Sequence, residues 1–186
     1  MNGFPLDSEG RGALCRSGLR GFDAAYCYGS YEGTLRSLIH LFKYSHIRTL
    51  ARPLSDLLAA ALPLDQVFDA VTPVPLHWRR QWQRGFNQSE LLAQATARRR
   101  GIPVIHALRR ARATETQAGL SNTERRRNVL AAFRPTRAAA RLRGQRVLLI
   151  DDVMTTGATL DELARTLKAH GATRVENRVL ARTLKN

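Results

Sequence analysis

The sequence has few cysteines and no long apolar run, and both absences exclude classes of protein. Its two cysteines, Cys15 and Cys27, cannot form a disulfide framework, so we expect free thiols in a cytoplasmic protein. The longest stretch without a formal charge, Ala70 to Trp78, has nine residues and is too short to span a bilayer. Residues 1–12 contain two acidic residues and no apolar segment, so we do not expect a secretory signal there.

The composition is that of a globular protein, with 44% hydrophobic and 24% charged residues in a chain of 186. It excludes a disordered tail and a collagen-like rod, and the length suits one domain with its own core. Residues 1–21 are rich in Gly, Ser and Arg and predict an irregular lead-in. We find no internal repeat or linker within residues 22–186 and expect them to form one domain.

Positive charge is concentrated in the middle of the chain. The formal net charge is +15, and residues 77–146 hold seventeen Arg, no Lys and three acids, a net +14 that leaves only +1 elsewhere. Such a segment favours a polyanionic partner, and single-stranded nucleic acid is one candidate. An Arg-rich genome composition is an alternative source of these arginines, although it explains their clustering less well.

Apolar periodicity predicts strands that alternate with helices. Strands are expected at 22–31, 67–74, 103–108, 147–150 and 174–181. Helices are expected from residue 33, over 49–62, 87–100 and 121–133, and from the end of the 155–159 turn to residue 171. Residues 109–119 predict an exposed loop. This order favours an α/β fold with a mainly parallel sheet flanked by helices, and the unbroken apolar run at 147–150 is typical of a strand buried on both faces.

The segment VLLIDDVMTTGAT, residues 147–159, is expected to carry the chemistry. Ligands bind at the carboxyl ends of strands in an open parallel sheet, where Asp151 and Asp152 are expected. The Thr155–Thr159 turn then begins a helix whose first N–H groups and positive dipole end bind phosphate, and Gly157 permits close approach. Two carboxylates would repel a bare phosphate, so they point to sugar hydroxyls or to a metal.

Each part of this segment also has an ordinary structural explanation. An Asp pair is a common N-cap, and Thr-Thr-Gly can be a polar turn. The succession of apolar strand, acidic pair, turn and amphipathic helix favours a ligand site.

The segment resembles the phosphoribosyl-diphosphate (PRPP) binding motif of the type I phosphoribosyltransferases. Further blocks resemble the ComF family, a branch named for a competence protein involved in DNA uptake. These blocks are YGSYEG (28–33), PVPLH (73–77) with GFNQ (85–88), and QAGLS (117–121) with ERRRN (124–128). The likeness runs from about Phe22 to the C-terminus and implies a Rossmann-like type I phosphoribosyltransferase fold.

The resemblance also implies a role for each matching residue. The ribose 5′-phosphate would be held by Thr155, Thr156, Gly157, Ala158 and Thr159. Asp151 and Asp152 would be the catalytic pair that holds the ribose 2′- and 3′-hydroxyls, directly or through Mg²⁺. Pyrophosphate would meet the loop residues Pro75, Leu76 and His77 and the cations Arg79, Arg80 and Arg84. Gln117, Arg125 and Arg126 would belong to a flexible flap that closes over the site. No general base is identified.

The chain departs from the family in its cysteines. ComF-like proteins often begin with a zinc ribbon of two Cys-x-x-Cys pairs, whereas Gly18 stands where Cys15 would have its partner. Because tetrahedral zinc needs four ligands, we expect residues 1–21 to be a degenerate remnant without zinc. Cys27 is expected to be a small apolar residue within a strand.

Several functions remain open. The first is Mg²⁺-assisted transfer of a 5-phosphoribosyl group from PRPP to a nitrogenous acceptor, and a PRPP sensor would use the same residues. Another is a single-stranded DNA-binding accessory protein of DNA uptake that keeps the fold without turnover. Trp78, Trp82 and Phe86 lie among arginines and suit base stacking, but their four-residue spacing also predicts a stripe facing the core. The acidic pair favours the first function, because a DNA-binding surface has no use for two carboxylates.

Overall fold

The computed structural model describes residues 21–45, 47–60, 66–76, 78–111 and 132–183. Its centre is a four-stranded parallel sheet in the order β1-β6-β5-β2. The strands are β1 (Ala24–Ser30), β2 (Ala70–Pro73), β5 (Arg146–Met154) and β6 (Arg174–Arg182). Ile150 in β5 is in register with Pro73 on one side and Arg178 on the other, so the carboxyl ends of all the strands meet at one edge.

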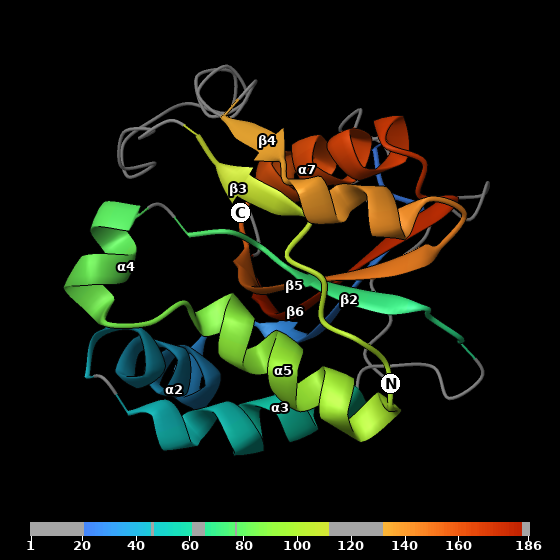
Figure 1. Ribbon diagram of the computed structural model, residues 1–186. Coiled ribbons are helices and arrows are strands. Elements are labelled where there is room, and N and C mark those ends of the chain that lie inside the picture. The colour runs from blue at the N-terminus through green and yellow to red at the C-terminus, as the bar shows by residue number, and fades with distance from the viewer. Residues whose placement is uncertain (1–20, 46, 61–65, 77, 112–131, 184–186) are drawn as a thin grey trace.

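Helices cover one face of this sheet, and a mixed layer covers the other (Figure 1). The first face carries α2 (Gly33–Tyr44), the 3-10 turn Arg48–Leu50, α3 (Ala51–Ala60) and α5 (Gln88–Arg100). The second carries α7 (Ala158–Ala169), the antiparallel pair β3 (Leu108–Arg110) and β4 (Phe133–Pro135), and the 3-10 helix Arg137–Leu142. The short helix α4 (Trp78–Arg84) leads from β2 to α5.

β5 is buried on both faces, as its apolar run predicts. Leu148 and Ile150 belong to the apolar core beneath α2, α3 and α5, whereas Val147 and Leu149 belong to the core beneath α7. Successive side chains of a strand point to opposite faces, so a strand between two covered faces needs apolar residues at every position. No helix in the described part of the chain is long and apolar enough to cross a membrane.

The α/β fold and the mainly parallel sheet are confirmed, and three local expectations need correction. The strand expected at 103–108 is wrong, because only Val104 pairs, with Val71, before the backbone turns locally from Ile105 to Ala107. Part of the loop expected from residue 109 is instead β3. The helix expected over 121–133 lies mostly outside the described residues, and Phe133 at its end belongs to β4. The expectations for residues 1–20, Cys15 included, also concern residues outside the description.

Candidate functional site

A cavity of about 300 Å³ lies at the carboxyl ends of β2 and β5. Asp151 and Asp152 at the end of β5 line it together with the whole Thr155–Thr159 turn. Pro75, Leu76 and Arg84, which follow β2, line it from the other side. The fold therefore brings together residues that the sequence separates by some 75 positions, at the edge of the sheet where α/β proteins bind ligands.

The turn into α7 is shaped by a glycine. Gly157 has φ 78°, a left-handed conformation that a residue with a Cβ adopts only with strain, and it is the N-cap of α7. Thr156 Oγ1 accepts a bond of 3.4 Å from the Ala158 N–H, and the Asp161 N–H donates to the Gly157 carbonyl at 2.9 Å. The first N–H groups of α7 lack partners within the helix, so this end of the cavity suits an anion.

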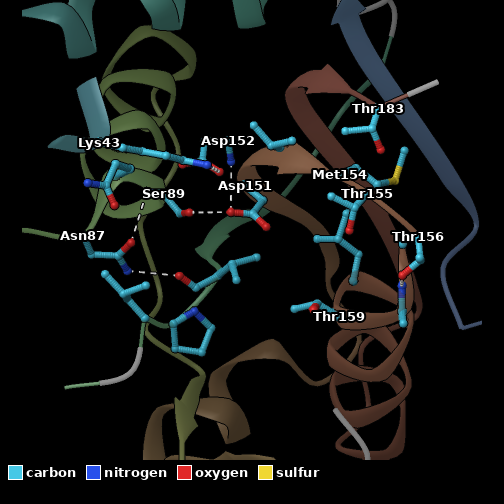
Figure 2. A pocket seen from close by; sticks show the side chains of 18 of the residues that line it. Lys43, Asn87, Ser89, Asp151, Asp152, Met154, Thr155, Thr156, Thr159 and Thr183 are labelled. Carbon is cyan, nitrogen blue, oxygen red and sulfur yellow. Dashed lines mark hydrogen bonds and ion pairs between the residues drawn. The ribbon is translucent and has the colours of Figure 1, made fainter. Parts of the chain in front are cut away.

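Asp151 is held from two sides. Its Oδ1 accepts a bond of 2.8 Å from the Ser89 hydroxyl at the start of α5 and one of 2.9 Å from the Asp152 N–H (Figure 2). Burial raises the pKa of Asp151 to about 7, and the adjacent charge of Asp152 acts in the same direction, whereas the Ser89 bond lowers it. At neutral pH this carboxyl is therefore close to its midpoint of ionisation.

Asp152 is paired with a lysine from another element. Lys43 Nζ in the last turn of α2 lies 3.1 Å from Asp152 Oδ1, and both side chains are largely buried. Burial alone would lower the pKa of Lys43, but the charge and hydrogen bond of Asp152 outweigh it and raise the pKa above its usual value. The ammonium thus stays charged and offsets part of the negative charge at the rim.

Asn87 joins the loop after β2 to α5. Its Oδ1 caps α5 by accepting a bond of 3.1 Å from the Ser89 N–H, and its Nδ2 donates to the Val74 carbonyl at 3.0 Å. The same residue therefore fixes both the loop and the helix turn that carries Ser89. Arg84 is held beside it by Gln88 at 3.2 Å and lies over the Tyr44 ring at 5.0 Å.

Sequence reasoning missed Lys43 and Ser89, and it gave Asn87 as the start of a helix and as part of the GFNQ block, with no role in the site. Lys43 had one available signal, because the chain uses lysine at only three positions. Other expected site residues lie outside the description: His77, the side chains of Arg79 and Arg80, and the flap residues Gln117, Arg125 and Arg126. Their roles stay predictions.

The acidic pair fits a metal that arrives with a substrate better than a resident one. Within the described residues, no group of three or more His, Cys, Asp or Glu side chains could hold a metal ion. Mg²⁺ is commonly bound through one or two carboxylates together with substrate oxygens, and Asp151 and Asp152 can supply that number.

Cys27, half-buried in β1, is a free thiol whose pKa is raised by burial.

Comparison with known proteins gives consistent matches. Residues 87–185 match the phosphoribosyl transferase domain family. The chain is 38% identical to competence protein F of Haemophilus influenzae over 168 residues, which cover 87% of this chain and 73% of that protein. It is 39% identical to DNA utilization protein YhgH of Escherichia coli K12 over 166 residues, which cover 83% of this chain and 70% of that protein. It is 38% identical to competence protein ComFC of Bacillus subtilis over 101 residues, which cover 54% of this chain and 39% of that protein. A solved PRPP amidotransferase from B. subtilis aligns with a TM-score of 0.49 and 24% identity over 72% of this chain and 26% of that one.

Proposed function

The chain belongs to the ComF family of phosphoribosyltransferase-fold proteins, and on that premise we propose that it binds PRPP and transfers the 5-phosphoribosyl group to a nitrogenous acceptor. One observation carries the proposal. The acidic pair at the end of β5 and the threonine-rich turn that begins α7 line the same cavity. A phosphorylated sugar needs this combination, because one end of it is an anion and the other carries hydroxyl donors.

The 5′-phosphate suits the α7 end of the cavity. The hydroxyls of Thr155, Thr156 and Thr159 add donors to the N–H groups of the helix, and the backbone at Gly157 carries no side chain that would hinder the approach. Together with the helix dipole, these donors would compensate the phosphate charge.

The ribose hydroxyls suit the carboxylates. Asp151 Oδ1 is occupied by Ser89 and Asp152 Oδ1 by Lys43, so one oxygen of each carboxylate is fixed and the other is left for a hydroxyl or a metal. The same pair would hold Mg²⁺ carried by PRPP, and the ion when bound would neutralise charge on the diphosphate.

Transfer breaks the bond between C1′ and the diphosphate oxygen and forms a bond from C1′ to the acceptor nitrogen. The electron pair leaves on pyrophosphate, and the acceptor nitrogen then loses its proton. Arg84 and the loop residues Pro75 and Leu76 line this cavity, and a cation there would stabilise the negative charge that develops on the departing group. His77, Arg79 and Arg80 are proposed to add to this site.

Calorimetry with PRPP and Mg²⁺, followed by pyrophosphate release against a panel of nitrogenous bases, tests the proposal. We expect saturable PRPP binding that the double variant Asp151→Asn and Asp152→Asn abolishes. The matched control is Asp56→Asn, which removes an exposed carboxylate outside the cavity and should bind PRPP as the parent does. Equal binding by the double variant and the parent would refute the ribose role.

A second candidate function, binding of single-stranded nucleic acid, is favoured by α4. Trp78 and Trp82 are 65% and 87% exposed, so the core-facing alternative is wrong for both of them and holds only for the buried Phe86. Relatives are named as competence and DNA utilization proteins. Exposed indoles offer stacking surfaces to bases, and neighbouring arginines suit phosphates.

This candidate is tested with a labelled oligothymidylate. We expect affinity that falls steeply with salt and weakens in Trp78→Ala with Trp82→Ala, but not in the Asp151 and Asp152 double variant. Affinity that ignored salt would contradict an arginine surface.

A further inference from the structure

A second cavity, of about 480 Å³, lies on the other side of the loop that follows β2. Pro75, Leu76, Asn87 and Arg110 line both cavities, so the loop is the wall between them. The volume is within the range of pockets that hold small ligands. In the proposed transfer, pyrophosphate departs toward this wall, and an acceptor attacks from the opposite face of the sugar. The acceptor therefore does not explain the second cavity.

The second cavity has an apolar floor and an aromatic rim. Apolar side chains lining it are Pro73, Phe86, Leu91 and Leu108. Trp78, at the start of α4, lines it with an indole that is largely exposed. A planar aromatic group entering the cavity can stack on this indole while covering the apolar floor.

Charge in the second cavity favours an anion. Among the described residues, three arginines, Arg48, Arg109 and Arg110, line it against one acid, Glu90. Arg48 is fixed by its bond of 2.8 Å to the Gly85 carbonyl, whereas Arg109 is exposed. The positive charges that line the cavity therefore outnumber the negative ones even when Glu90 is fully ionised.

One wall of the cavity carries a polar pair. Glu90 Oε2 lies 3.1 Å from His106 Nδ1, and Glu90 Oε1 accepts a bond of 2.7 Å from Gln94. His106 is thereby oriented, and its other ring nitrogen is available at a side chain that is 63% exposed. Such a nitrogen can bond the edge of a heterocycle whose face lies on Trp78.

We propose that the second cavity binds a nucleoside monophosphate. The base stacks on Trp78 with its edge toward His106, and the phosphate lies against Arg109. This site is separate from the PRPP cavity and does not depend on phosphoribosyl transfer.

Fluorescence of a Trp82→Phe protein tests the proposal, because Trp78 is then the only tryptophan in the chain. Titration with AMP, GMP, CMP and UMP is expected to give saturable quenching by at least one of them. Arg109→Gln should weaken that binding about tenfold, while Arg137→Gln, which removes an exposed arginine outside the cavity, should leave it unchanged. Equal weakening by both variants would mean diffuse attraction to a basic surface and would overturn the proposal.

Two further arms identify where the nucleotide binds and in what form. Ribose 5-phosphate is expected to occupy the first cavity if the PRPP proposal holds, and quenching by the nucleotide should persist at a saturating concentration of it. Loss of quenching would place the nucleotide in the first cavity and overturn the proposal, as would quenching by oligothymidylate but by no monophosphate. Calorimetry with PRPP is run on the same protein, so failure of the proposed transfer appears separately from failure of the nucleotide site.

Discussion

The negative charge of ionised Asp151 should destabilise the folded protein, so replacing this carboxyl by a neutral amide should raise the free energy of unfolding. Asp151→Asn keeps an oxygen that can accept the bonds from Ser89 and from the Asp152 N–H, but it cannot ionise. We expect this variant to lose PRPP binding and at the same time to resist urea better than the parent at alkaline pH.

The magnitude follows from the pKa. Burial, together with the charge of Asp152, raises the pKa of Asp151 from its ordinary 3.8 to about 7. One pKa unit is worth about 1.4 kcal/mol, so full ionisation costs the folded state at most about 4 kcal/mol. Because the side chain is partly exposed to solvent, we expect about half of that, roughly 2 kcal/mol.

The sign depends on pH. Below about pH 4 the carboxyl is protonated in both states and costs nothing. Between about pH 4 and pH 7 the unfolded chain releases a proton that the folded protein keeps, so the free energy of unfolding falls as the pH rises. Above about pH 7 the whole cost is present. The advantage of Asp151→Asn should therefore grow between pH 5 and pH 8.

Urea unfolding of parent and variant at pH 5, 6, 7 and 8 measures this difference. The matched control is Asp69→Asn, which should show the opposite sign. Bonds from the Arg146 side chain and N–H lower the pKa of Asp69, so its ionised form stabilises the fold above about pH 4 and that contribution is lost in acid. A constant offset between Asp151→Asn and the parent from pH 5 to pH 8 would refute the reasoning.

Three further changes test the supports of the site. Lys43→Met removes a charge that lowers the pKa of Asp151, so the pH midpoint of PRPP affinity measured by calorimetry should move upward. Lys43→Arg should restore the parent's midpoint, and an unmoved midpoint in Lys43→Met would contradict the effect of Lys43 on Asp151. Gly157→Ala forces φ 78° on a residue with a Cβ, and urea unfolding should show a loss of about 1–2 kcal/mol together with weaker PRPP binding; full stability would exclude strain at this turn. Asn87→Ala removes the N-cap of α5 and the side-chain bond to the Val74 carbonyl, so it should lower the free energy of unfolding by about 1 kcal/mol and weaken PRPP binding. Asn87→Asp should keep the cap, and unchanged PRPP affinity in Asn87→Ala would exclude a role of Asn87 in fixing the loop.

The local sequence pattern was enough to predict a strand that is buried on both of its faces. The apolar run at 147–150 indicated a buried central strand because neither face of β5 tolerates a polar residue there. The apolar run at 103–108 also indicated a strand, but there only Val104 pairs, and β3 begins at Leu108. The partners of residues 104–110 include Val71 in one strand and Phe133 and Arg134 in another, and no local property of the sequence specifies pairing over those distances.

The same distinction applies to the candidate site. Asp151, Asp152 and the Thr155–Thr159 turn are contiguous, so their spacing alone indicated a strand end and a helix start. Lys43 and Ser89 reach the acidic pair from α2 and α5, and only the packing of those helices on one face of the sheet shows it. The sequence indicated only that a helix begins at Asn87, because the bond of its side chain to the Val74 carbonyl is visible only in three dimensions.

The two proposed functions would use different parts of the fold. The chain carries +15, yet the rim of the first cavity holds two adjacent carboxylates with one lysine between them and the helix layer. The carboxylates themselves would repel a phosphate of a nucleic-acid strand, whereas sugar hydroxyls can donate hydrogen bonds to them. The exposed tryptophans stand on α4, which follows the loop that lines the cavity, and neither of them lines that cavity. A nucleic-acid strand held there would not need to displace PRPP, so we expect the two ligands to bind the same molecule together, and direct competition between them would show that they share one surface.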